Sequence, residues 1–385
     1  MKYLPLVVKN LFRKRTRSSL TIGSILLPFF VICILGTLLA TLDADPSEGA
    51  GMYRIAVRHK VSIANFLPAT HVEKIRQLAG VKAVTPFNWF GGQYVDFSAF
   101  NIFQRFGVDP EVLLDVFDEA KIVEGSADDW KRDRSGALVG RLLTRKYGWR
   151  LGQKVTLKGD IWPGTYEFTI RAIYKGQDES ILFFHQKVLD ERWPRRAGLT
   201  TNIWIKADSA ADVVRLIPQI NATFENSPWP VRAETEKEFQ NSFIGLLGNV
   251  KLLVKSLAVI IALVILLIAG NTMAMAARER ITEIAVLRAI GYPKKTVFGL
   301  LLGESLLLAL TGGVAGVLVY AALLPRLRAF LLYSPLAGFA AGMRLFPGVV
   351  AAAFVTTLLV GILAGLVPAI RSAQRSIVDG LRQVA

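Results

Sequence analysis

Four long apolar runs stand out in the pattern of hydrophobic and polar positions along this 385-residue chain. Each is long enough to cross a hydrocarbon core of roughly 30 Å as a helix, and the runs occupy residues 20–42, 256–277, 297–324 and 345–370. Between the first two runs, polar and apolar positions alternate over short distances, as in a folded domain exposed to water. The pattern predicts a membrane protein with four transmembrane α-helices and a large α+β extracytoplasmic domain between spans 1 and 2.

The domain is expected over residues 43–235, which are long enough for roughly two small α+β lobes. Strict alternation marks Tyr166–Tyr174 as a strand. The other predicted strands are 53–61, 81–86, 137–139, 154–157, 181–184, 202–206 and 231–234, and the predicted helices are 70–79, 141–147 and 210–224. Residues 97–129 are the least regular. Their aromatic stripe is more typical of a core than of a partner-binding surface, and it consists of Phe97, Phe100, Phe103 and Phe106.

The segment that enters span 2 carries a heptad pattern of apolar residues. Its alternating spacing of four and three is that of a coiled-coil seam, and its members are Phe239, Phe243, Leu246, Val250, Leu253 and Leu257. The pattern predicts one helix over 236–277, in which a stalk continues without interruption into span 2. The seam would pack either on a second protomer or on span 1 of the same chain.

Spans 3 and 4 carry small residues at spacings that let membrane helices approach closely. These residues suit packing within one protomer or between two, and they are Gly312, Gly313, Gly316, Gly361 and Gly365. Glu304 lies about two turns inside span 3, where an ionised carboxylate is costly. It would serve either as a proton or substrate site or as a bond to a neighbouring helix near the membrane interface.

The formal net charge of +16 is concentrated beside the membrane spans. Residues 43–242 hold 27 Lys and Arg against 26 Asp and Glu, so almost the whole excess lies in the other segments. This is the positive-inside pattern, not the basic surface of a nucleic-acid-binding protein. We therefore expect a multi-pass protein with both termini in the cytoplasm, the large domain outside, and no nucleic-acid partner.

Shorter segments complete the expected topology. Residues 1–19 are predicted to form an amphipathic cytoplasmic helix on the lipid surface, although a basic topology signal explains their charges equally well. The first span is long for a signal peptide and Asp43-Ala44-Asp45 is a poor cleavage site, so an uncleaved anchor is expected. Residues 325–344 form a short external loop, and residues 371–385 form a cytoplasmic tail.

The remaining cytoplasmic segment, residues 278–296, is too charged to span a bilayer. With no Gly or Pro before Gly291, we expect one helix from Ala277 to Tyr292 that stops at Gly291 and Pro293.

Two carboxylates in this helix, Glu279 and Glu283, lie one turn apart. Like charges at that spacing disfavour an isolated helix, so a basic partner would relieve their repulsion. Arg280 can pair with Glu283 within the helix. The apolar residues left for contact with a partner or the membrane are Ile281, Ile284, Ala285 and Leu287.

No sequence motif points to catalysis or to a bound cofactor. The chain has no GxxxxGK[ST] phosphate loop, no HExxH and no GxSxG. Its one cysteine, Cys33, lies in a span, and the scattered His59, His71 and His185 are more typical of packed or surface residues than of metal ligands. We expect a non-catalytic chain that holds no cofactor or metal.

The charged segment and its surroundings resemble the family of FtsX-like/MacB-like ABC transporter permeases. The strongest motif is RERITEIAVLRAIG, residues 278–291, and the resemblance continues through Glu304–Gly313 and Gly365–Ala373. In the expected domain it includes Val108–Glu111, Gly140–Leu143 and Gly152–Val155. The predicted topology agrees with that of the family as well.

The resemblance implies a homodimer of permease protomers in a bacterial inner membrane, each engaging a separate ABC ATPase that binds ATP and Mg²⁺. Residues 278–296 would be the coupling helix that sits in a groove of the ATPase. The residues expected to make this contact are Arg278, Glu279, Arg280, Glu283, Ile284, Leu287, Arg288 and Gly291.

Three functions fit these expectations. The first is mechanotransmission: ATP-driven motion of the ATPase would reach the external domain and export or extract a drug, lipid, peptide or lipoprotein, with a periplasmic adaptor and an outer-membrane duct. The alternative is a signalling scaffold that activates an external cell-wall hydrolase. The third, an ATPase-independent receptor or channel, requires the coupling motif to be a coincidence.

Overall fold

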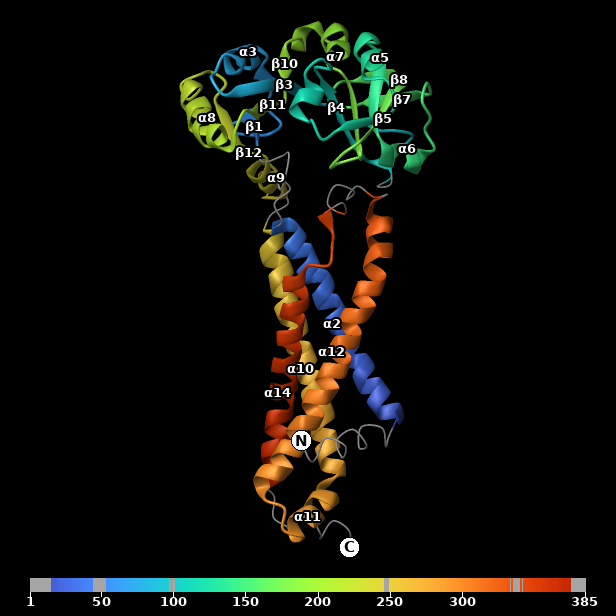
Figure 1. Cartoon of the computed structure of the whole chain (residues 1–385), viewed down its shortest axis with the longest axis vertical. Coiled ribbons are helices and arrows are strands. Elements are labelled where there is room, and N and C mark those ends of the chain that lie inside the picture. The colour runs from blue at the N-terminus through green and yellow to red at the C-terminus, as the bar shows by residue number, and fades with distance from the viewer. Residues whose placement is uncertain are drawn as a thin grey trace. The chain divides into compact units, whose positions relative to one another are not determined.

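The computed structural model describes residues 15–43, 53–96, 98, 101–245, 249–332, 334, 340 and 342–374 (Figure 1). The chain divides into two compact units. The helical unit comprises residues 1–43, 249–326 and 343–385, and the α+β unit comprises residues 44–248 and 327–342.

Four long helices, each apolar enough to cross a membrane, dominate the helical unit in the part of the chain described. They are α2 (Arg15–Asp43), α10 (Val250–Glu279), α12 (Lys294–Leu332) and α14 (Pro347–Gln374), and the short helix α11 (Ile281–Ala289) connects α10 to α12. With an α+β unit inserted between α2 and α10, this architecture confirms the predicted fold class.

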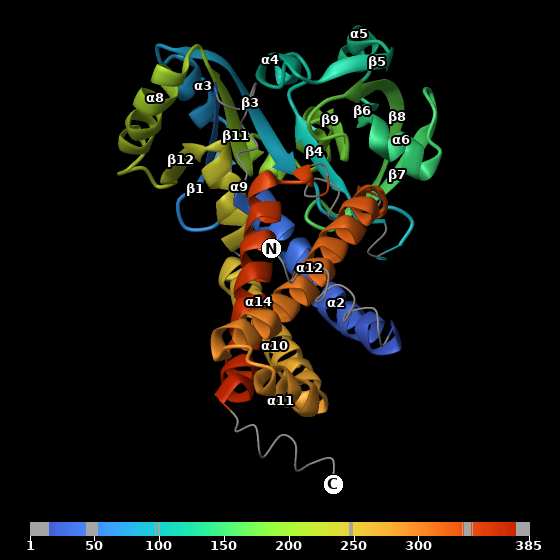
Figure 2. The same cartoon turned by 60° about the horizontal axis from the view of Figure 1, so that its bottom comes forward.

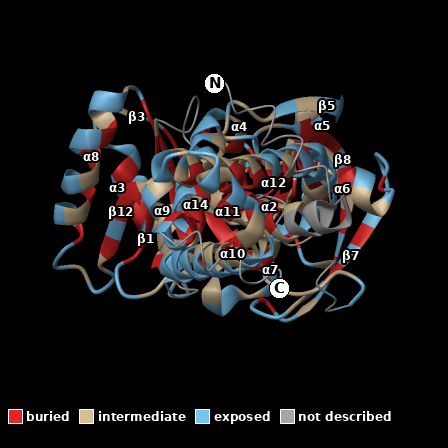
Figure 3. Cartoon of the chain, turned by 90° about the horizontal axis from the view of Figure 1, so that it is seen from below, coloured by how far each residue is buried: buried red, intermediate tan, exposed pale blue. Residues whose placement is uncertain are grey.

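The core of the helical unit forms where α2, α10 and α14 meet. Its buried side chains are those of Ile25, Phe29, Ile265, Ala269, Val360 and Ala364. Figure 3 shows buried residues in the interior of the unit and exposed residues on the outer faces of its helices. Since the outer faces are largely apolar, they are suited to lipid contact.

The five glycines predicted to pack helices all lie at helix contacts within the chain. On α12, a Cβ added at Gly312 would lie 2.6 Å from Ile25 of α2, and one at Gly316 would lie 2.8 Å from the Leu26 carbonyl oxygen. Gly313 abuts Thr357 of α14, while Gly361 and Gly365 of α14 abut Ala309 and Ser305 of α12. Only residues without a side chain let the helix backbones approach this closely.

The predicted stalk over 236–277 is not one continuous helix. Helix α9 (Glu236–Gly245) ends before α10 begins. Asn249 has non-helical φ −82° and ψ 61°, and its side chain accepts a hydrogen bond from the Leu252 N–H at 3.2 Å. Helix α9 ends at Gly245, a residue type with low helix propensity, and Asn249 caps a new helix. The heptad spacing of apolar residues gives no information about a glycine that ends a helix or about a side chain that caps the next one.

The α+β unit contains twelve strands and several short helices among its described residues. The strands are β1 (Arg54–His59), β2 (Leu67–Pro68), β3 (Val81–Trp89), β4 (Gln104–Val108), β5 (Lys121–Gly125), β6 (Gly136–Gly140), β7 (Lys154–Gly159), β8 (Gly164–Lys175), β9 (Ile181–His185), β10 (Leu199–Thr200), β11 (Asn202–Ala207) and β12 (Val231–Thr235). Besides α9, the helices are α3 (Thr70–Arg76), α4 (Leu113–Val116), α5 (Ala127–Arg132), α6 (Arg141–Tyr147), α7 (Lys187–Arg192), the 3₁₀ turn Pro194–Arg196 and α8 (Ala210–Thr223).

One ten-stranded mixed sheet runs through the unit in the order β12-β1-β11-β3-β4-β9-β6-β8-β5, with β7 paired to β8. Helices α3 and α8 pack at the β12–β1–β11 end, while α5, α6 and α7 lie around the other end (Figure 1). Each end has its own apolar core. The pairs β3–β4, antiparallel, and β4–β9, parallel, join the two halves.

The irregular segment 97–129 contains two strands and a helix that the sequence pattern did not predict. Strand β4 carries Phe106 and β5 lies at the sheet edge, while the preceding Phe103 is 8% exposed and belongs to an apolar core. Phe97 and Phe100 lie outside the described residues. The prediction that the aromatic stripe belongs to a core therefore applies to Phe103. The two short strands were not predicted because period-two alternation is recognisable only over longer runs.

Candidate functional site

The turn from α10 through α11 to α12 contains the residues of the charged motif and forms one end of the helical unit (Figure 2). The expected single helix is interrupted at Arg280, which has φ −108° and ψ 15° and separates α10 from α11. Its Nη1 donates to Oε2 of Glu304 on α12 at 2.7 Å. The break thus coincides with a tertiary ion pair, which local spacing does not reveal.

The Arg280–Glu304 pair is largely withdrawn from solvent, since the two side chains are 24% and 9% exposed. The pairing corresponds to the neighbouring-helix bond expected as one role for Glu304. Breaking a buried pair by removing one partner costs about 3–5 kcal/mol, and partial exposure of Arg280 places this pair below that range. The pair fixes the start of α11 to α12.

The inner face of α11 packs against the chain itself. Ile284 is 8% exposed and belongs to a cluster with Val297 and Leu301 of α12 and with Ala369 and Ala373 of α14. Ile284 was expected to contact the ATPase, and in this structure it is buried against α12 and α14. Its role is to hold α11 in place.

The outer face of α11 presents a stripe of exposed residues. Glu279 and Glu283 are exposed, and so are Val286 at 42% and Ile290 at 72%. Their spacing of three and four places Glu283, Val286 and Ile290 along one side of α11, and Glu279 is the last residue of α10, just before the break. We call these four residues the outer stripe of α11. It combines two carboxylates with two branched apolar side chains, which is unusual for a surface that contacts only water.

The end of α11 is set by its glycine. Gly291 has φ +105°, a conformation that residues with a side chain rarely adopt. The N–H of Tyr292 donates to the Leu287 carbonyl at 3.1 Å, which closes the last turn. Arg288 Nη1 reaches the carbonyl of Ala373 on α14 at 3.4 Å. Among the other predicted contact residues, Arg278 is exposed and Leu287 is half-buried.

Sequence reasoning missed Val286 and Ile290 as candidate contact residues. Their spacing of three and seven residues from Glu283 predicts that they share a helix face with it. The sequence alone did not decide which apolar residues of this helix pack against the chain and which face outward. Burial in the structure divides them: Ile284 and Ala285 face inward, and Val286 and Ile290 face outward.

The residues of the predicted stalk seam have different surroundings. Phe239 packs edge-on against Trp204 of β11, with ring centroids 5.4 Å apart, so it belongs to the α+β unit. Val250 is half-buried and Leu253 is 58% exposed at the start of α10. Leu246 and the side chain of Phe243 lie outside the described residues.

A buried arginine connects the first strand of the α+β unit to α9. The Arg54 side chain is 1% exposed, and its Nε donates to Glu236 at the start of α9 at 2.8 Å. Its Nη1 contacts both carboxylate oxygens of Glu119, which precedes β5, at 2.7 and 2.8 Å. Burial lowers the pKa of the guanidinium, but the two carboxylates outweigh burial and raise it. Arg54 therefore connects β1 with the start of α9 and with the loop that precedes β5.

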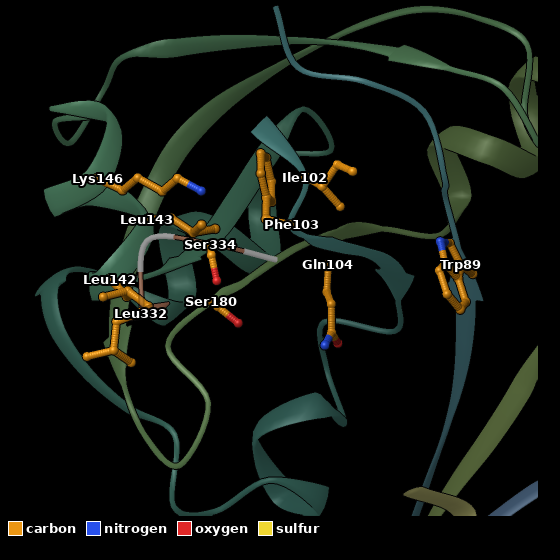
Figure 4. A pocket seen from close by; sticks show the side chains of 10 residues that line it. All are labelled: Trp89, Ile102, Phe103, Gln104, Leu142, Leu143, Lys146, Ser180, Leu332 and Ser334. Carbon is orange, nitrogen blue, oxygen red and sulfur yellow. The ribbon is translucent and has the colours of Figure 1, made fainter. Parts of the chain in front are cut away.

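A small pocket in the α+β unit does not resemble a substrate site (Figure 4). Its volume is about 90 Å³, whereas ligand sites are typically about 300–1,000 Å³. It is lined by Trp89, Ile102, Phe103, Gln104, Leu142, Leu143, Lys146, Ser180, Leu332 and Ser334. Across the described residues, no group of three or more His, Cys, Asp or Glu side chains could hold a metal.

Two family models match the chain. The model described as "MacB-like periplasmic core domain" matches residues 18–223, and the model described as "FtsX-like permease C-terminal" matches residues 255–377. The second match includes α11 and the whole turn. No curated protein matches the chain.

Three of the solved structures that match the chain overlap with about half of it. The extracellular domain of the noncanonic ABC-type transporter YknZ from Gram-positive bacteria has 14% identity and a TM-score of 0.35, covering 47% of this chain and 99% of that one. The periplasmic region of MacB from Actinobacillus actinomycetemcomitans has 11% identity and a TM-score of 0.37, covering 50% and 93%. A domain of a putative permease protein from Porphyromonas gingivalis has 12% identity and a TM-score of 0.33, covering 48% and 90%.

Proposed function

Because the chain belongs to the FtsX-like/MacB-like family of ABC transporter permeases, we propose that it transmits ATP-driven motion of a separate ATPase subunit to its α+β unit. The outer stripe of α11 is the ATPase contact, and α11 lies in the cytoplasm. The positive charge around the turn supports this placement, and it comes from Arg278, Arg280, Arg288, Lys294 and Lys295.

The observation that carries the proposal is the two-sided character of α11. Its inner face is fixed by Ile284 and by the Arg280–Glu304 pair, while its outer face exposes carboxylates beside Val286 and Ile290. A force applied to the outer face would therefore move α12 and α14 with α11. A groove with basic and apolar side chains on the ATPase would match the stripe.

The route outward follows the chain. Helix α10 runs between the turn and Asn249, and α9, which precedes it in the sequence, belongs to the α+β unit. Arg54 fixes the start of α9 to β1 and to Glu119, so movement of α9 would reach β1 and the loop before β5.

The substrate is handled outside the inner membrane, because four apolar helices offer no wide polar pore. A drug, lipid, peptide or lipoprotein is the cargo class, with a periplasmic adaptor and an outer-membrane duct as further partners. ATP and Mg²⁺ bind to the ATPase, and this chain contributes no catalytic residue. The protein works as a homodimer in a bacterial inner membrane, with both termini in the cytoplasm.

Charge reversal tests the proposed contact. The double variant Glu279→Lys/Glu283→Lys should insert into the membrane normally and lose most of the permease-dependent stimulation of ATP hydrolysis, measured with the copurified ATPase in proteoliposomes. The matched control is Glu124→Lys, the same change at an exposed position on β5, which should leave stimulation unchanged. Full stimulation in the double variant would contradict the proposal.

A further inference from the structure

The loop between β3 and β4 exposes large apolar side chains. Val95 is 74% exposed and Ile102 is 49% exposed, while Trp89 at the end of β3 is 37% exposed. We call these three residues the loop patch. The loop sequence contains two further phenylalanines, Phe97 and Phe100, which lie outside the described residues. Single exposed apolar residues are normal on a protein surface, but a group of them in one segment indicates a contact.

The inward side of the same loop is packed in a core. The rings of Tyr94 and Phe103 have centroids 6.1 Å apart, and both lie edge-on to the buried Trp149. Val95 follows Tyr94 in the chain, and Ile102 precedes Phe103. The two exposed side chains therefore come from neighbouring points of a loop whose other side is already anchored.

Hydrogen bonds hold the loop in this shape. Arg105 is 4% exposed, and its guanidinium donates to the carbonyl oxygen of Gly92 at 2.8 Å and to that of Asn101 at 3.0 Å. Within the loop, Oδ1 of Asp96 accepts from the Ser98 N–H at 2.9 Å and from the Asn101 amide at 2.6 Å. The loop patch is thus presented by a stiff loop.

Val95 is held in a strained backbone conformation. Its φ is +64°, and in the part of the chain that the structure describes it is the one residue other than glycine with positive φ. A β-branched residue rarely adopts this conformation, which costs on the order of 1–3 kcal/mol. Glycine would avoid that cost, so the strain indicates that the outward-facing valine side chain has a use.

The loop patch adjoins the C-terminal end of a membrane-spanning helix. Trp89 and Ile102 line a small pocket together with Leu332, the last residue of α12 (Figure 4). Residues 327–342 belong to the α+β unit, so this pocket lies within that unit. Arg326 is the last residue of α12 in the helical unit, and Leu332 follows it by only about 9 Å of helix.

The length of α12 places that end close to lipid headgroups. From Lys295 to Arg326 the helix is about 46 Å long, which matches a bilayer of roughly 40–45 Å with its headgroups. Arg326 and Arg328 are both exposed, and long basic side chains near a helix end reach the membrane surface. Leu332 and the pocket that it lines are therefore within reach of the lipid surface on the side of the α+β unit.

We infer that the loop patch rests on this lipid surface, with Val95 and Ile102 inserted among the headgroups of the nearer leaflet. Apolar side chains on a stiff loop gain free energy when they leave water for the boundary between headgroups and acyl chains. Lys146 lines the same pocket and supplies a positive charge for lipid phosphates.

The small size of the loop patch favours lipid over a protein partner. A stable protein interface buries about 800 Å² on each side, whereas insertion into lipid needs only a few apolar side chains. The contact would give the α+β unit an attachment to the bilayer in addition to its covalent connections. It involves no residue of α11 and is independent of the proposed ATPase contact.

Lipid-attached quenchers test the contact on the full chain in proteoliposomes. On a Cys33→Ala background, which removes the only cysteine, Val95→Cys or Ile102→Cys carries an environment-sensitive dye. The vesicles contain phosphatidylethanolamine and phosphatidylglycerol, with a fraction of lipids spin-labelled near the headgroup. The matched control is Val214→Cys on α8, since Val214 is also 74% exposed. Quenching by lipid should be at least severalfold stronger at both loop positions than at the control, and quenching by aqueous iodide should be weaker.

Two results would overturn the inference. The first is quenching by lipid at Val95 and Ile102 that is no stronger than at Val214. The second is protection of both loop positions from lipid quenchers and iodide alike, because this would show that a protein covers the loop patch.

An acidic side chain in the loop patch should weaken the contact. With the dye at Ile102, Val95→Asp should reduce quenching by spin-labelled lipid by roughly half or more, whereas Val214→Asp should leave it unchanged. Aspartate tolerates positive φ better than valine, so the variant should fold, and unfolding followed by tryptophan fluorescence checks this. Equal quenching in Val95→Asp and its parent would contradict the insertion of Val95.

Discussion

Arg54 forms buried ion pairs that no local sequence pattern predicts. In the sequence it is one basic residue at the start of a predicted strand. In the structure it is buried and binds Glu236 and Glu119, which come from segments 182 and 65 residues away. Sequence reasoning placed the strand correctly because strand spacing is local. It could not find the ion pairs because their partners are brought together only by the fold.

Replacing Arg54 should destabilise the α+β unit. Arg54→Gln leaves two carboxylates without their buried partner, and we expect a loss of about 3 kcal/mol in the free energy of unfolding. All seven tryptophans lie between residues 89 and 229, so tryptophan fluorescence during denaturant unfolding of the full chain follows this unit specifically.

The control for Arg54 is Arg232→Gln. Arg232 also binds a glutamate, Glu234, at 2.9 Å, but its side chain is 57% exposed. Glu234 is buried but keeps Arg58 as a partner at 2.8 Å, so loss of the exposed Arg232 leaves no unpaired buried carboxylate and should cost less than about 1 kcal/mol. A similar loss of unfolding free energy in both variants would show that burial of the Arg54 ion pairs does not account for their contribution to stability.

His185 should make the same unit sensitive to mild acid. It is 3% exposed, its Nε2 lies 2.7 Å from the Trp130 carbonyl, and burial lowers its pKa from 6.5. The unfolded chain therefore binds more protons than the folded one below about pH 6.5, so this group's contribution to stability is present above that pH and is lost as the pH falls. Between pH 7.5 and 5.5, the wild type should lose more unfolding free energy than His185→Gln. Parallel pH profiles for the two proteins would contradict this.

At the scale of elements, long apolar runs and strict alternation were sufficient to predict most of the fold. The helix predicted at 141–147 coincides with α6, and the predicted strand Tyr166–Tyr174 lies within β8. The interruptions were missed at Asn249 and Arg280, where a side-chain cap and a tertiary ion pair, respectively, accompany the end of helical structure. Periodicity describes a continuous face and carries no information about such breaks.

Helix packing in the membrane unit should depend on which glycine is changed. Gly313→Ala places a methyl group against Thr357 of α14, and Gly365→Ala places one 2.6 Å from the Cβ of Ser305. Overpacking of this kind costs about 1–3 kcal/mol. Both variants should lose helical circular dichroism at lower SDS fractions than the wild type.

Another glycine of α12 provides the control for these variants. A Cβ at Gly299 would meet nothing within 4 Å, and alanine favours a helix over glycine by up to about 1 kcal/mol. Gly299→Ala should therefore be neutral or slightly stabilising. If Gly299→Ala destabilised the helical unit as much as Gly313→Ala, close packing of helices at the predicted glycines would not explain the loss of stability.

At the scale of the whole molecule, family membership and fold class followed from the sequence, whereas the site was only partly predicted. The motif at 278–291 located the turn, and its two glutamates, expected to contact a partner, are exposed in the structure. Ile284 was expected to face a partner but is buried against its own chain, and the exposure of Val286 and Ile290 was not predicted. Which side of a helix faces its own chain depends on α12 and α14, which lie elsewhere in the sequence.

The account's central claim is that the outer stripe of α11 contacts the ATPase while the inner face holds α11 to its own chain. Photo-cross-linking tests it directly, with a light-activated amino acid placed at Val286, Ile290 or Ile284 of the full chain coexpressed with the ATPase of the same system. Val286 and Ile290 should yield a permease–ATPase product whose amount changes with ATP, and Ile284 should yield none. Cross-linking from Ile284 but not from Ile290, or from neither stripe position, would contradict the account.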